Sequence, residues 1–128
     1  MGTDDNNAIR DIQHYHARGV HRIVLRGLLA IMDGRWDVHV SVIRAGHHID
    51  GVHNPGGIAV DLNNYGPGGA ASRRPGTTSS THPTRFVHWL KINRAALGHI
   101  RIGGGAGRAK WGTDFADSDT HIHIDWKH

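Results

Sequence analysis

The stretch THIHIDW, residues 120–126, decides the fold of this chain because it alternates strictly from end to end. Successive side chains of a strand point to opposite faces of its sheet. One face therefore carries Thr120, Ile122, Ile124 and Trp126, and the other carries His121, His123 and Asp125. β-Branched apolar residues on one face predict a half-buried strand. Its polar face then presents two imidazoles and a carboxylate side by side.

Three more strands are expected upstream. Residues 37–44 place Val38, Val40 and Val42 on one face, and residues 57–62 place Asp61 opposite Val60 and Leu62. Residues 98–102 form a short strand with Ile100 and Ile102 toward the core. The same parity turns four further polar side chains toward the face of Asp61 and His123: His39, Ser41, His99 and Arg101.

Three helices are expected, over residues 4–17, over residues 20–32 and from Pro83 to Gly98. Apolar residues recur in each at helical spacing, and a glycine follows where each helix would stop. Residues 63–82 are expected to form a loop. The glycine-rich run at 103–110 is expected to be a loop too, because it lacks the Gly-Lys-Ser/Thr ending of a phosphate-binding loop.

These elements predict a single α+β domain over residues 1–128. A helical N-terminal part, residues 4–33, precedes a core over residues 37–126. We expect a small, antiparallel-rich sheet that carries a polar site on one face, with about three helices packed on the other.

The composition excludes several kinds of chemistry. The chain has no Cys, which excludes a disulfide framework, a thiolate metal site and a cysteine nucleophile. All 11 acidic residues are Asp, which excludes a mechanism that needs a glutamate base. The formal net charge of +4 favours polyanionic partners such as nucleic acid or an anionic cell envelope. No apolar run is long enough to span a membrane, and the polar N-terminus does not resemble a signal peptide.

Imidazole and carboxylate groups that are remote in the sequence predict a zinc site. A catalytic zinc centre takes three protein ligands and keeps one position open for water. Such a set is supplied by His53, Asp61 and one member of the pair His121 and His123. The other member would then orient a water molecule or carry a proton, although a set with both histidines is an alternative. The adjacent His47 and His48 are not expected to be ligands, because neighbouring loop residues seldom converge on one ion.

Three motifs, in this order, resemble those of a known superfamily. Ser41-Val42-Ile43-Arg44 is followed by His53-Asn54-Pro55-Gly56-Gly57-Ile58-Ala59-Val60-Asp61, and then by His121-Ile122-His123-Ile124-Asp125-Trp126. Their order and strand contexts are similar to those of the zinc D-Ala-D-Ala carboxypeptidase superfamily, which includes Hedgehog-type domains and phage endolysin peptidases. The resemblance covers residues 37–126.

The resemblance implies a role for each matching residue. His53, Asp61 and His123 are the expected ligands of a Zn²⁺ ion, and His121 is expected to assist catalysis without binding the ion. Arg44 is expected to bind substrate or to polarise the scissile carbonyl.

The implied activity is zinc-dependent hydrolysis of an amide bond in peptidoglycan or its stem peptides, by a carboxypeptidase or an endopeptidase. Such an enzyme is expected to be a monomer and to work at the cell wall, in an extracellular, periplasmic or phage-associated setting.

Two other functions remain as alternatives. The first is a non-catalytic zinc-binding or cell-wall-binding module of the same fold. The second is a basic nucleic-acid-binding protein, which the composition disfavours. Aromatic residues make up only 6% of the chain, too few for a base-stacking platform, and the basic residues form no known nucleic-acid-binding motif.

Overall fold

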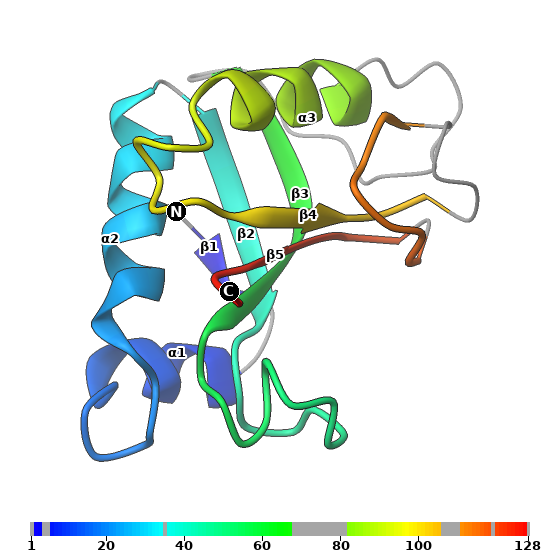
Figure 1. Cartoon of the computed structure of the whole chain (residues 1–128). Helices are drawn as coiled ribbons and strands as arrows, with labels where there is room; N and C mark the ends of the chain where they lie inside the picture. The colour runs from blue at the N-terminus through cyan, green and yellow to red at the C-terminus, as the bar shows by residue number, and fades with distance from the viewer. Residues whose placement is uncertain are drawn as a thin grey trace.

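The computed structural model of the chain describes residues 2–3, 6–34, 36–67, 82–105, 111–118 and 120–127. The helices are α1 (Asn6–Gln13), α2 (Arg22–Asp33) and α3 (His82–Ile92). The strands are β1 (Gly2–Thr3), β2 (Trp36–Val42), β3 (Ala59–Pro67), β4 (Arg101–Gly103) and β5 (Ile122–Asp125) (Figure 1).

The strands form one sheet in the order β1-β2-β3-β5-β4. β1 runs parallel to β2, and each of the other neighbouring pairs is antiparallel. The prediction of a small α+β fold with an antiparallel-rich sheet and three helices is confirmed. β5 lies between β3 and β4, so the stretch that the sequence marks as the clearest strand is paired on both sides.

One hydrophobic core holds the helices against one face of the sheet. Many of its members come from the strands (Val38, Val40, Val60, Leu62, Ile102, Ile122, Ile124) and from α2 and α3 (Val24, Leu28, Ile31, Phe86, Val87, Leu90). Burial of each such side chain contributes roughly 1.5–3 kcal/mol. The alternate positions of β3, β4 and β5 therefore lie on the opposite face, as expected, and these positions carry the polar site.

Trp126 anchors the end of β5 to α2. Its indole Nε1 donates to the carbonyl of Leu97 at 2.7 Å. A Cβ atom at Gly27, in the middle of α2, would lie 2.3 Å from Cζ2 of Trp126, so only a glycine lets the ring pack there. A helical glycine costs roughly 1 kcal/mol relative to alanine. The close contact between Trp126 and α2 accounts for that cost.

β2 departs from the strict alternation that the sequence predicts. Val40 pairs with Leu62 and Val42 pairs with Asp61, which leaves Ser41 as the extra residue of a β-bulge. After the bulge Ile43 is fully buried, whereas Val42 is only partly buried. The expectation that Val42 faces the core is therefore wrong, because the bulge reverses the parity.

Other boundaries also differ from the sequence prediction. β3 continues to Pro67, so residues 63–67 are strand where we expected a loop. α3 ends at Ile92, and turns rather than helix lead from there to Gly98. Residues 68–81 and 106–110, where we expected loops, lie outside the described residues. None of the described helices combines the length and the apolar character that a membrane span requires.

Candidate metal centre

Two adjacent strands and one loop bring the predicted ligands together. Asp61 on β3 lies directly opposite His123 on β5 in the antiparallel register, so their side chains emerge on the same face. His53 comes from the loop that precedes β3. The carboxylate of Asp50 fixes this loop by accepting hydrogen bonds from the backbone N–H groups of Val52 and His53, at 3.1 and 2.8 Å.

The atoms that could bind a metal lie within contact distance of one another. His53 Nε2 is 3.1 Å from Asp61 Oδ1 and 3.1 Å from His123 Nδ1. His123 Nδ1 is 3.2 Å from the same Asp61 oxygen. All three residues are buried, with at most 5% of their surface exposed. The structure therefore brings together the three residues that the resemblance assigns to zinc.

Hydrogen bonds to the far side of each imidazole decide which nitrogen faces this cluster. His53 Nδ1 lies 2.6 Å from the carbonyl of Ile43, and because a carbonyl only accepts, this nitrogen carries the proton. His123 Nε2 lies 2.7 Å from Asp125 Oδ2 and donates to it. In the neutral imidazoles, His53 Nε2 and His123 Nδ1 are therefore unprotonated, and each carries a lone pair. Two nitrogen lone pairs and a carboxylate oxygen point at one another, and a positive charge must lie between them.

The spacing of these atoms suits zinc. Zinc binds imidazole nitrogen and carboxylate oxygen at about 2.0–2.1 Å in a tetrahedral arrangement, so two ligand atoms on one ion lie about 3.3 Å apart. The observed separations are 3.1, 3.1 and 3.2 Å. The bonds from the far nitrogens to a carbonyl and a carboxylate are the outer contacts that orient histidine ligands.

The electrostatics of the metal-free cluster show the same need for positive charge. Burial lowers the pKa of His123, but its hydrogen bonds with Asp125 and Asp61 outweigh burial and raise the pKa to about 9. Burial raises the pKa of Asp61, but its hydrogen bonds with His123 and His53 hold the pKa well below the usual value. Without a metal ion, a proton on His123 supplies the charge that the cluster requires.

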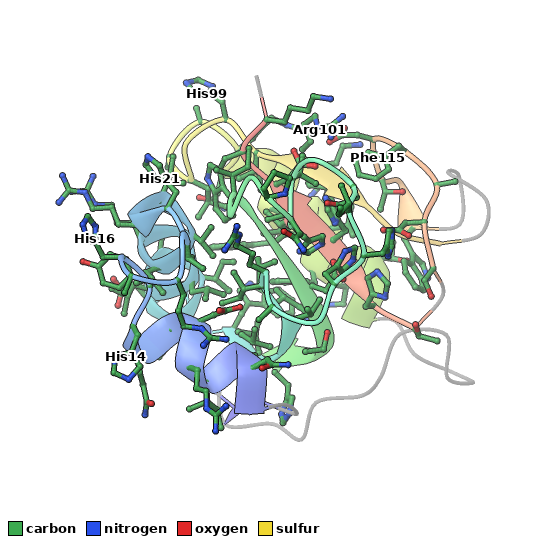
Figure 2. All side chains as sticks on the ribbon, turned by 90° about the horizontal axis from the view of Figure 1, so that it is seen from below. His14, His16, His21, His99, Arg101 and Phe115 are labelled. Atoms are coloured by element: carbon green, nitrogen blue, oxygen red, sulfur yellow. The ribbon has the colours of Figure 1, made fainter. Side chains whose placement is uncertain are left out.

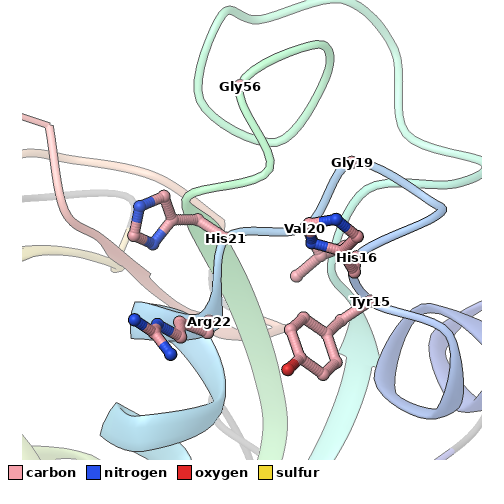
Figure 3. A pocket seen from close by; sticks show the side chains of 7 residues that line it. All are labelled: Tyr15, His16, Gly19, Val20, His21, Arg22 and Gly56. Atoms are coloured by element: carbon pink, nitrogen blue, oxygen red, sulfur yellow. The ribbon is translucent and has the colours of Figure 1, made fainter.

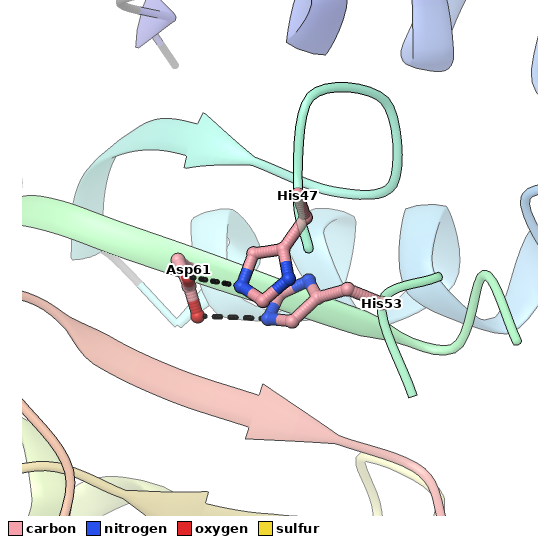
Figure 4. Close-up of side chains that lie close together, drawn as sticks. All are labelled: His47, His53 and Asp61. Carbon is pink, nitrogen blue, oxygen red and sulfur yellow. Dashed lines mark hydrogen bonds and ion pairs between the residues drawn. The ribbon is translucent and has the colours of Figure 1, made fainter. Parts of the chain in front are cut away.

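His47 lies beside the cluster, although adjacent loop histidines were not expected to be ligands. His47, His53 and Asp61 form a group whose ligand atoms lie within 4.8 Å of one another and could hold a metal ion. Figure 4 shows His47 and His53 converging on Asp61. The ring of His47 stacks on that of His53, with centroids 4.0 Å apart, and its Nε2 is 3.9 Å from Asp61 Oδ2. No periodicity governs a loop, so the sequence gives no signal for this placement.

His121 lies at the edge of the cluster and contacts two carboxylates. Its Nε2 is 3.6 Å from Asp61 Oδ2 and 3.4 Å from Asp117 Oδ2. Burial lowers the pKa of His121, but the hydrogen bond with Asp117 and the charge of Asp61 raise it above its ordinary value. The imidazole thus lies beside two carboxylates that favour its protonated form, with its side chain 23% exposed.

Arg44, which was expected to contact substrate, contacts two backbone carbonyls. Its Nη1 donates to the carbonyl of Arg18 at 2.7 Å and its Nε to that of Pro55 at 3.1 Å. The guanidinium ties the turn before α2 to the loop that carries His53. Arg44 does not line the hollow beside the metal cluster, in the part of the chain that the structure describes. The role of Arg44 in substrate binding, which the resemblance implies, stays a prediction.

The cluster opens into a hollow of about 270 Å³. Among the described residues, its charged and titratable walls include Asp61, Arg101, Asp117, His121, His123 and Asp125. Of the four other groups that strand parity offered, Arg101 is on this wall, whereas His39, Ser41 and His99 are not. Arg101 and Phe115 are labelled near one edge of the molecule in Figure 2.

A larger hollow, of about 580 Å³, lies elsewhere, near the start of α2 (Figure 3). Its walls include Tyr15, His16, His21 and Arg22. The described residues that line it include neither a carboxylate nor any member of the metal cluster. Size alone would select this hollow, but the convergence of ligand atoms selects the smaller one.

No family model matches this chain, and no curated protein or solved structure matches it either. The functional proposal therefore rests on the geometry of this centre and on the motifs of the sequence.

Proposed function

We propose that this protein is a zinc-dependent hydrolase that cleaves an amide bond in the peptides of peptidoglycan. The observation that carries the proposal is the convergence of His53 Nε2, Asp61 Oδ1 and His123 Nδ1 within 3.1–3.2 Å of one another. Three nitrogen and oxygen ligands, with a hollow of about 270 Å³ beside them, match the pattern of a catalytic rather than a structural zinc site.

His53, Asp61 and His123 would hold the ion. When bound, Zn²⁺ supplies Lewis acidity and lowers the pKa of a water molecule toward neutrality. The metal itself stays a proposal, because the same ligand atoms also suit other divalent transition ions.

His121 supplies the proton transfer that amide hydrolysis requires. The leaving amine must gain a proton, and His121 lies at the wall of the hollow, where its contacts with Asp117 and Asp61 raise its pKa and favour the protonated imidazole. Asp117 orients the imidazole, because its Oδ2 lies 3.4 Å from the Nε2 atom of His121. General acid catalysis of this kind contributes about 10²–10⁴-fold to a rate.

The substrate class comes from the motif resemblance and from the charge of the chain. The resemblance points to the stem peptides of peptidoglycan. A formal net charge of +4 favours association with a cell wall that carries anionic polymers.

The test is digestion of purified peptidoglycan by the metal-free and the zinc-loaded protein, with the product masses read out. We expect new products only with zinc, and their masses identify the bond. His121→Gln is expected to keep its zinc and to lose about 10²–10⁴-fold in rate, whereas His88→Gln, at an exposed position on α3, is expected to change neither. Zinc-independent digestion, or full activity in His121→Gln, would contradict the proposal.

His47 favours a second candidate, a non-catalytic metal-binding module. If His47 Nε2 were a fourth ligand, the centre would have no open position and would be a structural site. Its distance of 3.9 Å from Asp61 Oδ2 exceeds the 3.1–3.2 Å separations within the inner set, which favours the open centre. His47→Ala distinguishes the two, because an open centre keeps its zinc affinity within about threefold, whereas a closed centre loses a ligand and at least about tenfold in affinity.

A further inference from the structure

Basic side chains gather on one part of the surface, where α1 ends and α2 begins. Residues 10–26 contain four arginines, three histidines and a single acidic residue, Asp11. Asp11 is 1% exposed, and its carboxylate accepts hydrogen bonds inside the fold from Arg18 Nε and from the backbone N–H groups of Arg44 and Ala45. The charge that this segment presents to the surroundings is therefore positive.

The larger hollow, of about 580 Å³, lies in this part of the surface (Figure 3). The described residues that line it include His16, His21 and Arg22 and no carboxylate. Figure 2 shows His14, His16 and His21 on the same side of the molecule. His21 Nδ1 accepts a hydrogen bond from the backbone N–H of Ile23 at 3.1 Å, so the neutral ring carries its proton on Nε2. The hollow therefore presents N–H donors and positive charge to a ligand.

Arg22 and Arg26 continue this charge along α2. Four residues separate them, so they share one face of the helix and lie about 6 Å apart along its axis. Arg26 borders a second hollow, of about 220 Å³, whose described lining residues also include no carboxylate. Neither arginine forms an ion pair with another described residue, whereas Arg94 and Arg101 each pair with an aspartate. The donors of Arg22 and Arg26 are therefore available to a ligand from outside the chain.

The charges of α2 stand in the order that a helix disfavours. The partial charges of a helix favour anions at its N-terminal end and cations at its C-terminal end. α2 begins with Arg22 and ends with Asp33, with no acidic residue in its first turn and no basic residue in its last. Folding alone does not account for an arginine at this position. Residues that break a local rule in this way are typical of functional sites.

A chain that repeats a phosphate group fits these observations. The planar fork of arginine binds phosphate through two parallel hydrogen bonds, and two arginines one turn apart can meet two charges of one chain. Nucleic acid without sequence preference is bound on a platform of aromatic rings. Tyr15 is the one tyrosine, tryptophan or phenylalanine among the described residues that line these two hollows. A phosphodiester chain without bases therefore suits this surface better than a nucleic acid does.

We propose that the basic face formed by His16, His21, Arg22 and Arg26 binds the phosphates of a base-free phosphodiester polymer of the cell wall. Poly(glycerol phosphate) is the simplest polymer of this class. That the polymer belongs to a cell wall rests on the proposed function, whereas the phosphate chemistry rests on the basic face itself.

The basic face is joined to the loop that delivers His53 to the metal centre. Gly56 of that loop lines the larger hollow, and the backbone N–H of His21 donates to the carbonyl of Gly57 at 2.8 Å. A polymer held at the basic face therefore keeps the metal centre beside the wall. Tethering of this kind raises the effective concentration of the substrate without any new contact at the metal.

The test is the affinity of the zinc-loaded protein for poly(glycerol phosphate) of defined length, measured by calorimetry at about 50 and about 200 mM salt. Arg22→Gln and Arg26→Gln are each expected to weaken binding by about 3- to 10-fold and to reduce the salt slope by about one. Arg22→Lys is expected to lose less than Arg22→Gln, because lysine keeps the charge but lacks the planar fork.

Arg85→Gln is the matched control. It removes the same charge from an exposed position on α3, which packs near the end of α2, away from the basic face (Figure 1). It is expected to keep the wild-type affinity within about twofold, because salt screens distant surface charges. The zinc content and melting temperature of each variant show whether the centre and the fold are retained, and Arg22→Lys and Arg26→Gln serve if Arg22→Gln loses either.

Equal losses in Arg85→Gln and in the two α2 variants would show that net charge alone binds the polymer, and would overturn the assignment. Binding of an oligothymidylate with the same number of phosphates more than about tenfold more tightly would also overturn it, because stacked bases would then supply the affinity.

The basic face and the proposed hydrolysis can fail separately. Binding that depends on Arg22 and Arg26 in a protein that cuts no peptidoglycan would leave the phosphate site standing and contradict the hydrolase proposal. Zinc-dependent digestion by a protein that does not bind poly(glycerol phosphate) would have the opposite meaning.

Discussion

At the scale of single residues, the centre depends on what holds the outer nitrogen of each histidine. The carbonyl of Ile43 holds His53 and the carboxylate of Asp125 holds His123, so each ring presents its other nitrogen to Asp61. Asp125 is itself held by Arg101. A ligand whose rotation is restricted in this way loses little entropy when it binds an ion, and its basicity is raised by the anionic partner.

Asp125→Asn tests this outer contact directly. The amide keeps the shape of the carboxylate but removes its charge from His123, so we expect zinc affinity to fall by about 10- to 100-fold. Competition with a chelator of known affinity measures the change. Asp114→Asn is the control, because Asp114 pairs with Arg94 in the same bidentate manner without contacting a proposed ligand. Equal zinc affinities in the wild type and Asp125→Asn would show that the contact has no effect on the metal.

The titration of His123 predicts opposite pH dependences with and without metal. In the metal-free protein the pKa of His123 is raised from 6.5 to about 9, so its contribution to stability is complete below pH 6.5 and is lost as the pH rises through 9. We expect the free energy of unfolding in EDTA to fall by about 3 kcal/mol over this window. Zinc requires the deprotonated imidazole, so its affinity should rise over the same window, by up to about tenfold per pH unit.

Urea unfolding and zinc titration at pH 6.5, 7.5, 8.5 and 9.5 measure the two slopes, with pH values chosen to bracket the window. His123→Gln should flatten the first slope. A metal-free stability that rises with pH between 6.5 and 9.5 would have the wrong sign for this account.

At the scale of elements, the centre is assembled from one register and one loop. The pairing of β3 with β5 sets Asp61 opposite His123, and the loop at residues 50–57 delivers His53. Gly57 joins the loop to β3: its N–H donates to the carbonyl of His53 and its own carbonyl accepts from His21. Its φ of +62° is unfavourable for other residues, and an added Cβ would lie 2.0 Å from the carbonyl oxygen of Gly19.

Gly57→Ala is expected to be severe because it combines backbone strain with a backbone clash. We expect a loss of roughly 2–5 kcal/mol in the free energy of unfolding and a weaker zinc affinity, since His53 must move with the loop. Gly51→Ala separates the two causes: its φ is +90°, but an added Cβ meets nothing within 4 Å. That control should lose only about 1–2 kcal/mol. Similar losses in both variants would show that the packing of Gly57 against Gly19 is unimportant.

The sequence predicts the elements of this fold well where a period is present and poorly where it is not. The alternation of residues 120–126 correctly predicts β5 and the faces of its side chains, and three helices are found where apolar spacing predicts them. The β-bulge at Ser41 is not predicted. It adds one residue to β2 relative to β3, and the alternation of polar and apolar residues in the sequence of β2 does not show it. The placement of Arg44 is missed because the bulge changes the parity of the residues after it, and that of His47 because a loop has no period.

At the scale of the whole molecule, the two faces of the sheet have different roles. The face toward the helices is apolar and stabilises the fold, and the other carries the metal cluster, its outer contacts and the hollow. β3, from the middle of the chain, pairs with β5, near its C-terminus, although α3 and β4 separate them in the sequence. The candidate ligands could be named from the sequence because the order of the motifs along the chain is visible in the sequence itself. Their convergence on one point, and the position of Arg101 beside the hollow, can be seen only in the three-dimensional structure.

The central claim is that one metal ion is bound by His53, Asp61 and His123, and the most direct test is the zinc content of purified variants after dialysis, measured by mass spectrometry with native folding checked in parallel. We predict one zinc per chain in the wild type and in the exposed-histidine variant His88→Ala. We predict loss of bound zinc in His53→Ala, Asp61→Ala and His123→Ala. Retention of stoichiometric zinc by folded His123→Ala, or a wild-type protein that binds none, would contradict the account.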